Sequence, residues 1–308
     1  MYYTMIYIHG ALGDLRLNEG DFEVMNDKII ITTFTDPMMG LSWEYEPTFR
    51  KLEAHFRDII EFRYIMSVLV PNVYRLVDSK DMRISNEFAL KKYNERLAKI
   101  YESEEAISGM PINMNDFHLF SVENTSSRPL NLAYKAVQLI DKNKAGLFLY
   151  NLRYATVFEC RQTTKLEEIL NVVKKTDIDC EKFLEFYNNG IAENALNHDL
   201  ILTKELGIYT LPAYLIQHNG KNALIRILIE YESFVSVIKD ISNGKILPQN
   251  PELNVETFSE FLNKHPLISL LELKEAFDFE DTDGVKKFLS QIPSEKYVLK
   301  DDFIKFLP

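Results

Sequence analysis

The chain has 308 residues, of which 46% are hydrophobic and 26% are charged, and this composition excludes a disordered protein. The length is enough for about two domains. Its 35 Lys and Arg stand against 46 Asp and Glu, and the net charge of -11 disfavours a polyanionic partner such as nucleic acid. The two cysteines are too few for a disulfide framework or a four-thiolate zinc site.

Residues 1–27 are expected to form an N-terminal extension, for which an added edge strand and a packed arm are the open alternatives. This region has no basic leader, and charged residues interrupt its apolar positions, so we expect no signal peptide. No run reaches 18 uncharged apolar residues, so we expect no membrane span. These observations predict a soluble, cytoplasmic protein.

A strand, a helix and a second strand are predicted next in the chain. Lys28–Thr35 (KIIITTFT) is typical of a buried strand and ends at Asp36-Pro37. A helical pattern runs from about Glu44 to Phe56, and Ile59–Val70 returns to strand character. The three elements predict a β-α-β unit with a right-handed crossover.

A long helical block follows, from about residue 73 to 187 and beyond. Its expected helices are Asn86–Ser103, Leu130–Ile140, Leu147–Cys160, Thr163–Lys175, Cys180–Asn188 and Ala192–Leu206. Thr164 and Glu167 have the spacing of a capping box at the start of one of these helices.

The chain then returns to strands. Within Ile208–Gln217, which contains Leu211-Pro212, Ala213–Gln217 is an apolar run. Asn219-Gly220 lies between this run and Ala223–Ile229 and is the strongest hairpin signal in the sequence. A helix is expected at Tyr231–Ile241. Two β-rich pieces that flank a helical block predict one α/β domain, residues 28–247, with a helical insertion at about 73–187.

A small C-terminal module is predicted for residues 252–308. Helices are expected at Val255–Asn263, Leu267–Phe277 and Asp283–Gln291, with a terminal hairpin at Tyr297–Phe306. This order is similar to a winged-helix module. Acidic residues outnumber its seven Lys and it has no Arg, so we expect it to pack against the rest of the chain or contact a protein, and not to bind DNA.

Four segments carry a family resemblance that covers about residues 28–247. They are Thr35–Pro47 (TDPMMGLSWEYEP), Ser126–Val137 (SSRPLNLAYKAV), Gly146–Arg161 (GLFLYNLRYATVFECR) and Glu205–Ile216 (ELGIYTLPAYLI). In this order they resemble the DsbA branch of the thioredoxin superfamily, and in particular the FrnE-like group of dithiol-disulfide isomerases. The resemblance implies an α/β, thioredoxin-like fold with a helical insertion and, for active members, protein dithiol-disulfide oxidation or isomerisation.

This sequence departs from the family at the position of its chemistry. Active members carry Cys-x-x-Cys at the start of the first helix, and the match places Met39 and Ser42 at the two cysteine positions. A thioether cannot form the thiolate nucleophile, and a serine cannot resolve a mixed disulfide. We therefore predict that the dithiol chemistry is absent and that no residue here is catalytic.

Other residues near this position receive ordinary structural interpretations. Ser42 is expected to cap the first helix, and Trp43 to line the core or a groove. Cys160 and Cys180 both lie in helical patterns without a nearby partner, so two inert core thiols are expected.

The resemblance also implies a groove beside a cis-proline, Pro212. Such a groove binds an extended segment through main-chain hydrogen bonds, as a strand added to a sheet. The alternative is that Pro212 only shapes the fold. The residues predicted to form the groove are Met39, Gly40, Ser42, Trp43, Leu211 and Pro212.

The sequence thus predicts a redox-inactive module that binds an extended peptide or a client protein. One alternative is a glutathione-dependent transferase or isomerase of the kappa-class type, with glutathione in the same groove. A second is a cytoplasmic adaptor that delivers client proteins to a protease. The six His residues are dispersed, so we expect no metal, and we expect no cofactor apart from glutathione in the first alternative.

Overall fold

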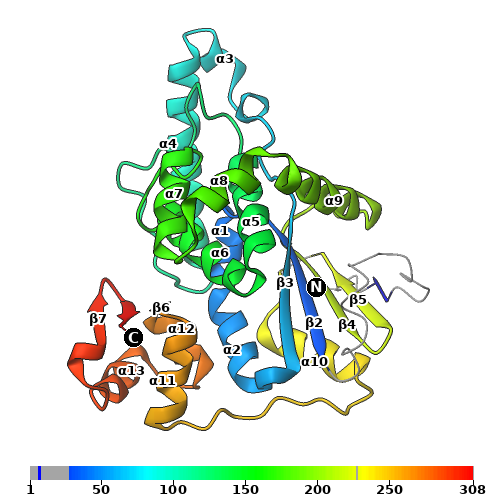
Figure 1. Cartoon of the computed structure of the whole chain (residues 1–308), viewed down its shortest axis with the longest axis vertical. Helices are drawn as coiled ribbons and strands as arrows, with labels where there is room; N and C mark the ends of the chain where they lie inside the picture. Colours follow the sequence, from blue (N-terminus) through cyan, green and yellow to red (C-terminus); the bar gives the residue numbers. More distant parts are fainter. Residues whose placement is uncertain (1–5, 8–27, 227, 308) are drawn as a thin grey trace. The chain divides into compact units, whose positions relative to one another are not determined.

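The computed structural model describes residues 6–7, 28–226 and 228–307 (Figure 1). The chain divides into two compact units. The first comprises Met1–Phe34, Glu46–Ile65 and Ile208–Pro308, and the second comprises Thr35–Tyr45 and Met66–Gly207. We call them the sheet unit and the helical unit. The predicted domain boundaries at 27, 247 and 252 stay a prediction.

The main sheet has five strands in the order β1-β5-β4-β2-β3. Its strands are β1 (Ile6–Tyr7), β2 (Ile29–Thr35), β3 (Ile60–Met66), β4 (Ala213–His218) and β5 (Lys221–Ile225). The pairs β2-β4, β4-β5 and β1-β5 are antiparallel. Ile6–Tyr7 therefore form an edge strand, whereas the rest of the predicted N-terminal extension lies outside the described residues.

The hairpin that the sequence predicts is present between β4 and β5. Asn219 and Gly220 have φ of 46° and 76°, the positive values that a two-residue turn of this twist requires. The predicted run at Ala213–Gln217 is confirmed by β4, which begins at Ala213 directly after the cis Leu211-Pro212 bond, whereas β5 ends at Ile225, before the predicted Ile229.

Aromatic side chains fill the core of the sheet unit. Phe49 of α2 (Glu46–Phe56) packs its ring 5.4 Å from Phe62 of β3 and 6.0 Å from Tyr214 of β4. Phe234 of α10 (Tyr231–Ile241) lies 5.1 Å from the same Tyr214 ring. These ring contacts attach α2 and α10 to the sheet.

The first predicted helix is divided in two. The sequence pattern predicts one helix from Glu44, but the structure has a short α1 (Gly40–Glu44), a break at Tyr45 and then α2. The start of α1 four residues earlier follows from the turn at Asp36, because the Met39 N–H donates to the Asp36 carbonyl oxygen at 3.0 Å.

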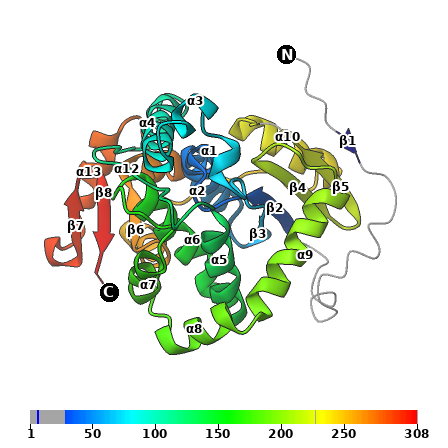
Figure 2. The same cartoon turned by 90° about the horizontal axis from the view of Figure 1, so that it is seen from above.

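The helical unit is built around α5 (Arg128–Ile140), which packs against α6 (Lys142–Val157), α8 (Cys180–Asn188) and α9 (Ile191–Glu205) (Figure 2). Leu130, Ala133, Tyr134 and Val137 are buried at the spacing of one helical face, which explains why this segment packs on three neighbours. The unit also contains α4 (Asn86–Glu104) and α7 (Leu166–Lys175).

Two details of the helical prediction are wrong. The predicted capping box of Thr164 and Glu167 does not form, because α7 begins only at Leu166 and Lys165 is its N-cap, with no side-chain cap. The Thr164 hydroxyl donates instead to the Leu119 carbonyl. In addition, α6 ends at Val157, so Cys160 lies beyond the helix with φ of 53°.

The C-terminal module contains α11 (Val255–Lys264), β6 (Leu267–Ser269), α12 (Leu270–Ala276), α13 (Thr282–Leu289), β7 (Tyr297–Lys300) and β8 (Phe303–Phe306). Its three strands form an antiparallel sheet in the order β6-β8-β7. The prediction of a helix at Leu267–Phe277 is wrong for its first three residues, which pair with β8. The core of the module, around Phe258, Leu273 and Ile304, also includes Ala54 of α2.

Among the helices that the structure describes, none is both long enough and apolar enough to cross a lipid bilayer.

Candidate functional site

The turn before α1 is held by the carboxyl group of Asp36, which is fully buried. Its oxygens accept hydrogen bonds from four groups: Met38 N, Leu69 N, Ser127 Oγ and Asn131 Nδ2, at 2.6–3.0 Å. Burial raises the pKa of Asp36, and these hydrogen bonds reduce that rise. The position at which α1 begins is therefore fixed from three segments of the helical unit. This role of Asp36 was not predicted from the sequence, although Asp before Pro is a common turn signal.

Met39 is the N-cap residue of α1, at φ −78° and ψ 113°, and no side chain caps the helix there. Its side chain is buried, with 5% of its surface exposed. Because a thioether sulfur carries no ionisable proton, the first position of the family motif holds no nucleophile.

Ser42 is not the helix cap, so that prediction is wrong. It lies inside α1, and its Oγ is 2.8 Å from Oγ1 of Thr35. The buried guanidinium of Arg153 donates to the same Thr35 oxygen at 2.9 Å. Only 1% of the surface of Ser42 is exposed, and its hydroxyl is hydrogen-bonded inside the helical unit.

Trp43 belongs to the core of the helical unit. It is fully buried, and its Nε1 donates to the Pro111 carbonyl oxygen at 3.2 Å. Its ring lies 5.2 Å from the ring of Tyr150 and 6.3 Å from that of Tyr154. The structure thus favours the core interpretation of Trp43 over the groove wall.

The C-terminal end of α4 closes directly on the start of α1. A Cβ at Gly40 would lie 2.0 Å from Oε2 of Glu104 and 2.6 Å from the ring of Tyr101, so only glycine fits. The Tyr101 hydroxyl also donates to the Met38 carbonyl. A carboxyl group therefore lies beside the start of α1.

Two carboxyl groups of this region have strongly raised pKa values. Burial raises the pKa of Glu104 to about 7, and the nearby Glu44 charge adds to the rise. Burial likewise raises the pKa of Glu44 to about 7, although Ser108 donates to it through its hydroxyl at 2.6 Å and its N–H at 3.2 Å. Sequence patterns gave no sign of this pair, because the end of α4 meets α1 only in the tertiary fold.

The two cysteines lie in different segments of the helical unit. Both are free, and the Cys160 Sγ donates to the Asn113 carbonyl oxygen at 2.7 Å. Burial, with a smaller contribution from Asp116, raises the pKa of the Cys160 thiol to about 11. The prediction that Cys160 lies in a helix is wrong, whereas Cys180 is the first residue of α8 as predicted.

The cis-proline loop belongs to the sheet unit. Leu211-Pro212 is a cis peptide bond directly before β4, as the family resemblance implies. Pro212 is buried, Leu211 is half-buried, and 87% of Tyr209 is exposed. Met39, Gly40, Ser42 and Trp43 lie together in the helical unit, and the groove predicted from both sets of residues stays a prediction.

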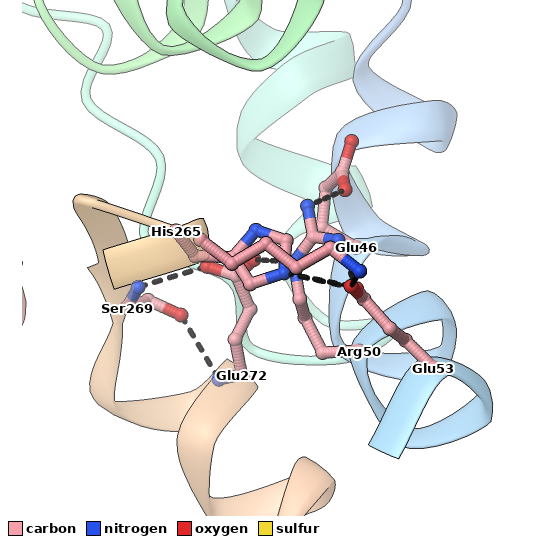
Figure 3. A network of polar contacts seen from close by, with 7 residues as sticks. Glu46, Arg50, Glu53, His265, Ser269 and Glu272 are labelled. Carbon is pink, nitrogen blue, oxygen red and sulfur yellow. Dashed lines mark hydrogen bonds and ion pairs between the residues drawn. The ribbon is translucent and has the colours of Figure 1, made fainter. Parts of the chain in front are cut away.

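A buried cluster of charges joins α2 to the C-terminal module within the sheet unit (Figure 3). Arg50 donates to Glu46, Glu53 and Glu272 at 3.0–3.2 Å. Glu272 is also the N3 residue of a capping box, in which its Oε2 accepts from the Ser269 N–H at 2.8 Å and its own N–H donates to Ser269 Oγ at 3.0 Å. The carboxyl group of Glu272 thus caps α12 and also pairs with Arg50 of α2.

Glu53 extends this cluster to α11 and the residue after it. His265 lies 3.0 Å from the Glu53 carboxylate, and Lys264 also contacts it at 2.6 Å. Burial opposes the charge of Glu53, but His265, Arg50 and Lys264 together hold its pKa well below its ordinary value. The spacing of Glu46, Arg50 and Glu53 on one helix was visible in the sequence, but the partners from the C-terminal module were not.

Among the residues that the structure describes, no group of three His, Cys, Asp or Glu side chains is placed to hold a metal ion.

Comparison with known proteins identifies the family. A family model described as thioredoxin matches residues 32–236, about two thirds of the chain. The chain belongs to this thioredoxin family. The solved structure of a probable DsbA oxidoreductase from Streptomyces coelicolor is similar, with a TM-score of 0.53, 14% identity, and coverage of 74% of this chain and 93% of that one. The protein is thus a thioredoxin-family protein with a DsbA-like fold and without Cys-x-x-Cys, whereas its place in the FrnE-like group stays a prediction.

Two curated relatives of this thioredoxin-family protein carry the same name. The ClpXP adapter protein SpxH of Halalkalibacterium halodurans is 24% identical, over 87% of this chain and 84% of its own length. The ClpXP adapter protein SpxH of Bacillus subtilis is 22% identical, over 88% and 85%. The matched regions extend well beyond the part that the family model covers.

Proposed function

We propose that this protein is a redox-inactive adapter, which binds a client protein and presents it to a protease of the ClpXP type in the cytoplasm. The observation that carries the proposal is Met39 at the N-cap of α1. The family resemblance predicts this position for the nucleophilic cysteine of an active member. Thiol–disulfide exchange begins with attack by a thiolate, and a thioether cannot supply one.

Cys160 does not offer a second route to the same chemistry. With a pKa of about 11, only about one part in 10,000 of its thiol is ionised at pH 7. Its hydrogen bond to the Asn113 carbonyl also favours the protonated form, because a thiol donates and a thiolate cannot. A protein that keeps the fold without the chemistry retains its capacity to bind.

The relatives support the delivery role. Both are named as ClpXP adapters, and the similarity covers more than four fifths of each chain. In this protein the client contact is assigned to the predicted groove beside Leu211 and Pro212. The exposed Tyr209 and half-buried Leu211 offer side chains there, and the following strand β4 is intact.

The proposal is tested by client capture followed by degradation. The full chain and a Leu211→Arg variant are used as baits, and a protein captured by the wild type alone is purified. We expect purified ClpXP to degrade that protein about tenfold faster when the wild-type chain is added, and not when the variant is added.

An unchanged degradation rate with the wild-type chain would contradict the adapter role. Saturable glutathione binding with turnover of a thiol substrate would instead favour the kappa-class alternative. Tyr209→Ala is the matched variant, because it removes only an exposed ring. Tyr209→Ala and Leu211→Arg should both keep the wild-type melting temperature, which separates the loss of a local contact from a general loss of folding.

A further inference from the structure

A second surface of the helical unit combines exposed apolar side chains with a firmly held backbone. Leu76, Met82 and Ile84 are 43%, 39% and 67% exposed, and they lie within nine residues of one another around α3 (Ser79–Met82). Figure 1 shows α3 beyond α7 and α8, at one end of this unit. Exposed apolar residues that gather in one short segment make it a candidate contact surface.

Hydrogen bonds show that this exposure does not come from a frayed segment. The Asp78 side chain caps α3 by accepting from Lys80 N at 2.8 Å, and Ser85 caps α4 by accepting from Phe88 N at 3.1 Å. The Arg96 guanidinium of α4 donates to the Leu76 carbonyl and so fastens the segment to the helix. The apolar side chains are therefore presented on an ordered scaffold.

The charge of this region is opposite to that of the whole chain. Residues 75–99 contain seven Lys and Arg against four Asp and Glu, in a protein of net charge -11. All seven are exposed: Arg75, Lys80, Arg83, Lys91, Lys92, Arg96 and Lys99.

The basic residues of α4 gather on one face of the helix. Lys91, Lys92 and Lys99 share that face with Glu95 and the half-buried Phe88, as their spacing along the helix requires. Lys92 pairs with Glu95 at 2.9 Å, and its ammonium lies 5.9 Å from the Phe88 ring. Lys91 and Lys99 are thus the positions from which charge can reach a partner.

We propose that residues 75–99, which we call the insertion tip, dock an acidic, amphipathic segment of a partner protein. Leu76, Met82 and Ile84 would bury the apolar face of that segment, and Lys91 and Lys99 would pair with its carboxylates. Apolar contact gives affinity, whereas charge complementarity selects the partner and speeds its encounter.

A nucleic acid fits this surface less well than a protein does. Phosphate recognition gains nothing from exposed Met82 and Ile84, and the carboxylates of Asp81, Glu87 and Glu95 interrupt the basic residues. The proposal goes beyond the client groove beside Pro212, because it depends on a different surface and on no property of Met39.

Fluorescence anisotropy with the full chain tests the insertion tip. The probe is a labelled 18-residue helical peptide with Leu on one face and Glu on the other. Its counterpart carries Lys in place of Glu, and a 20-nucleotide single-stranded RNA is the third probe. We expect the acidic peptide to bind, and the basic peptide and the RNA to bind at least tenfold more weakly.

Two variants of the tip separate its apolar and ionic contributions. Met82→Ser with Ile84→Ser should weaken binding of the acidic peptide about tenfold at every salt concentration. Lys91→Glu with Lys99→Glu should weaken it about tenfold at low salt and less at high salt. Lys286→Glu with Lys287→Glu, exposed lysines of α13, is the matched charge control and should leave binding unchanged.

Equal binding by the tip variants and the wild type would overturn the proposal, as would preferential binding of the RNA. Leu211→Arg should not change binding of the acidic peptide, so a failure here is distinct from a failure of the adapter role.

Discussion

Replacing Arg50 with Met tests whether buried charges attach the C-terminal module to α2. Arg50 has 8% of its surface exposed and serves three carboxylates, from Glu46, Glu53 and Glu272, at 3.0–3.2 Å. Methionine replaces the apolar stem of the side chain but leaves these buried negative charges without their shared cation. Removing one partner of a buried ion pair costs about 3–5 kcal/mol. For a chain of this size, such a loss lowers the melting temperature by about 10 °C.

The measurement is urea unfolding combined with hydrogen exchange. We expect Arg50→Met to lose about 3–5 kcal/mol of unfolding free energy. We expect the amides of α11, α12 and β8 to exchange faster, because the module loses its contact with α2. Arg50→Lys keeps the charge but loses the planar fork, so its loss should be intermediate.

Arg63→Met is the matched control in the same unit. Arg63 pairs with Glu61 at 2.7 Å near the surface, and pairs of this kind contribute about 0–1 kcal/mol. A loss of less than about 1 kcal/mol in Arg50→Met, equal to that of the control, would refute the reasoning that the buried cluster holds the module.

Three further predictions concern the region around α1. Gly40→Ala should destabilise the protein by about 1–3 kcal/mol, because its Cβ would overlap the ring of Tyr101, whereas Gly146→Ala, with nothing within 4 Å of the new Cβ, should stabilise it by about 0.5–1 kcal/mol in urea unfolding. Because the pKa of Glu104 is raised on folding, the folded protein keeps a proton that the unfolded chain releases between about pH 4.5 and 7. The contribution of Glu104 to stability therefore falls as the pH rises through this range. Glu104→Gln should therefore exceed the wild type by about 1–2 kcal/mol at pH 8, after allowance for partial exposure, and by less at pH 5; equal stability at both pH values would contradict this. Iodoacetamide should alkylate Cys160 at least about tenfold more slowly at pH 8 in the native protein than in guanidinium, as followed by peptide mass spectrometry, and equal rates would show an exposed, ionised thiol.

Local patterns predicted much of the fold. The hairpin at Asn219-Gly220 and the helix at Tyr231–Ile241 are confirmed, because a positive-φ turn and one apolar face are properties of the sequence itself. The DsbA-like fold is confirmed as well, since the segments that carried the resemblance were recognisable without any knowledge of contacts.

The errors came where tertiary contacts override the local pattern. Ser42 looked like a helix cap, but the buried Asp36 starts α1 earlier and turns Ser42 toward Thr35. Residues 267–269 looked helical, yet β8 offers them a ladder of backbone hydrogen bonds. The apolar spacing of a short segment does not distinguish these outcomes, because it records only which side chains are buried.

The candidate site was predictable in its chemistry but not in its surroundings. The absence of a thiol at Met39 is a fact of the sequence. The approach of Glu104 to Gly40, and the burial that raises the pKa of Cys160, depend on segments distant in the chain. No periodicity or motif carries that information.

Insulin reduction by the purified chain, with dithiothreitol as the reductant, tests whether the protein lacks dithiol chemistry. We expect the wild type to precipitate insulin at the uncatalysed rate, and Cys160→Ser with Cys180→Ser to behave identically. A rate well above the uncatalysed one that disappears in this double variant would show that the protein exchanges disulfides through a thiol other than the one its family uses.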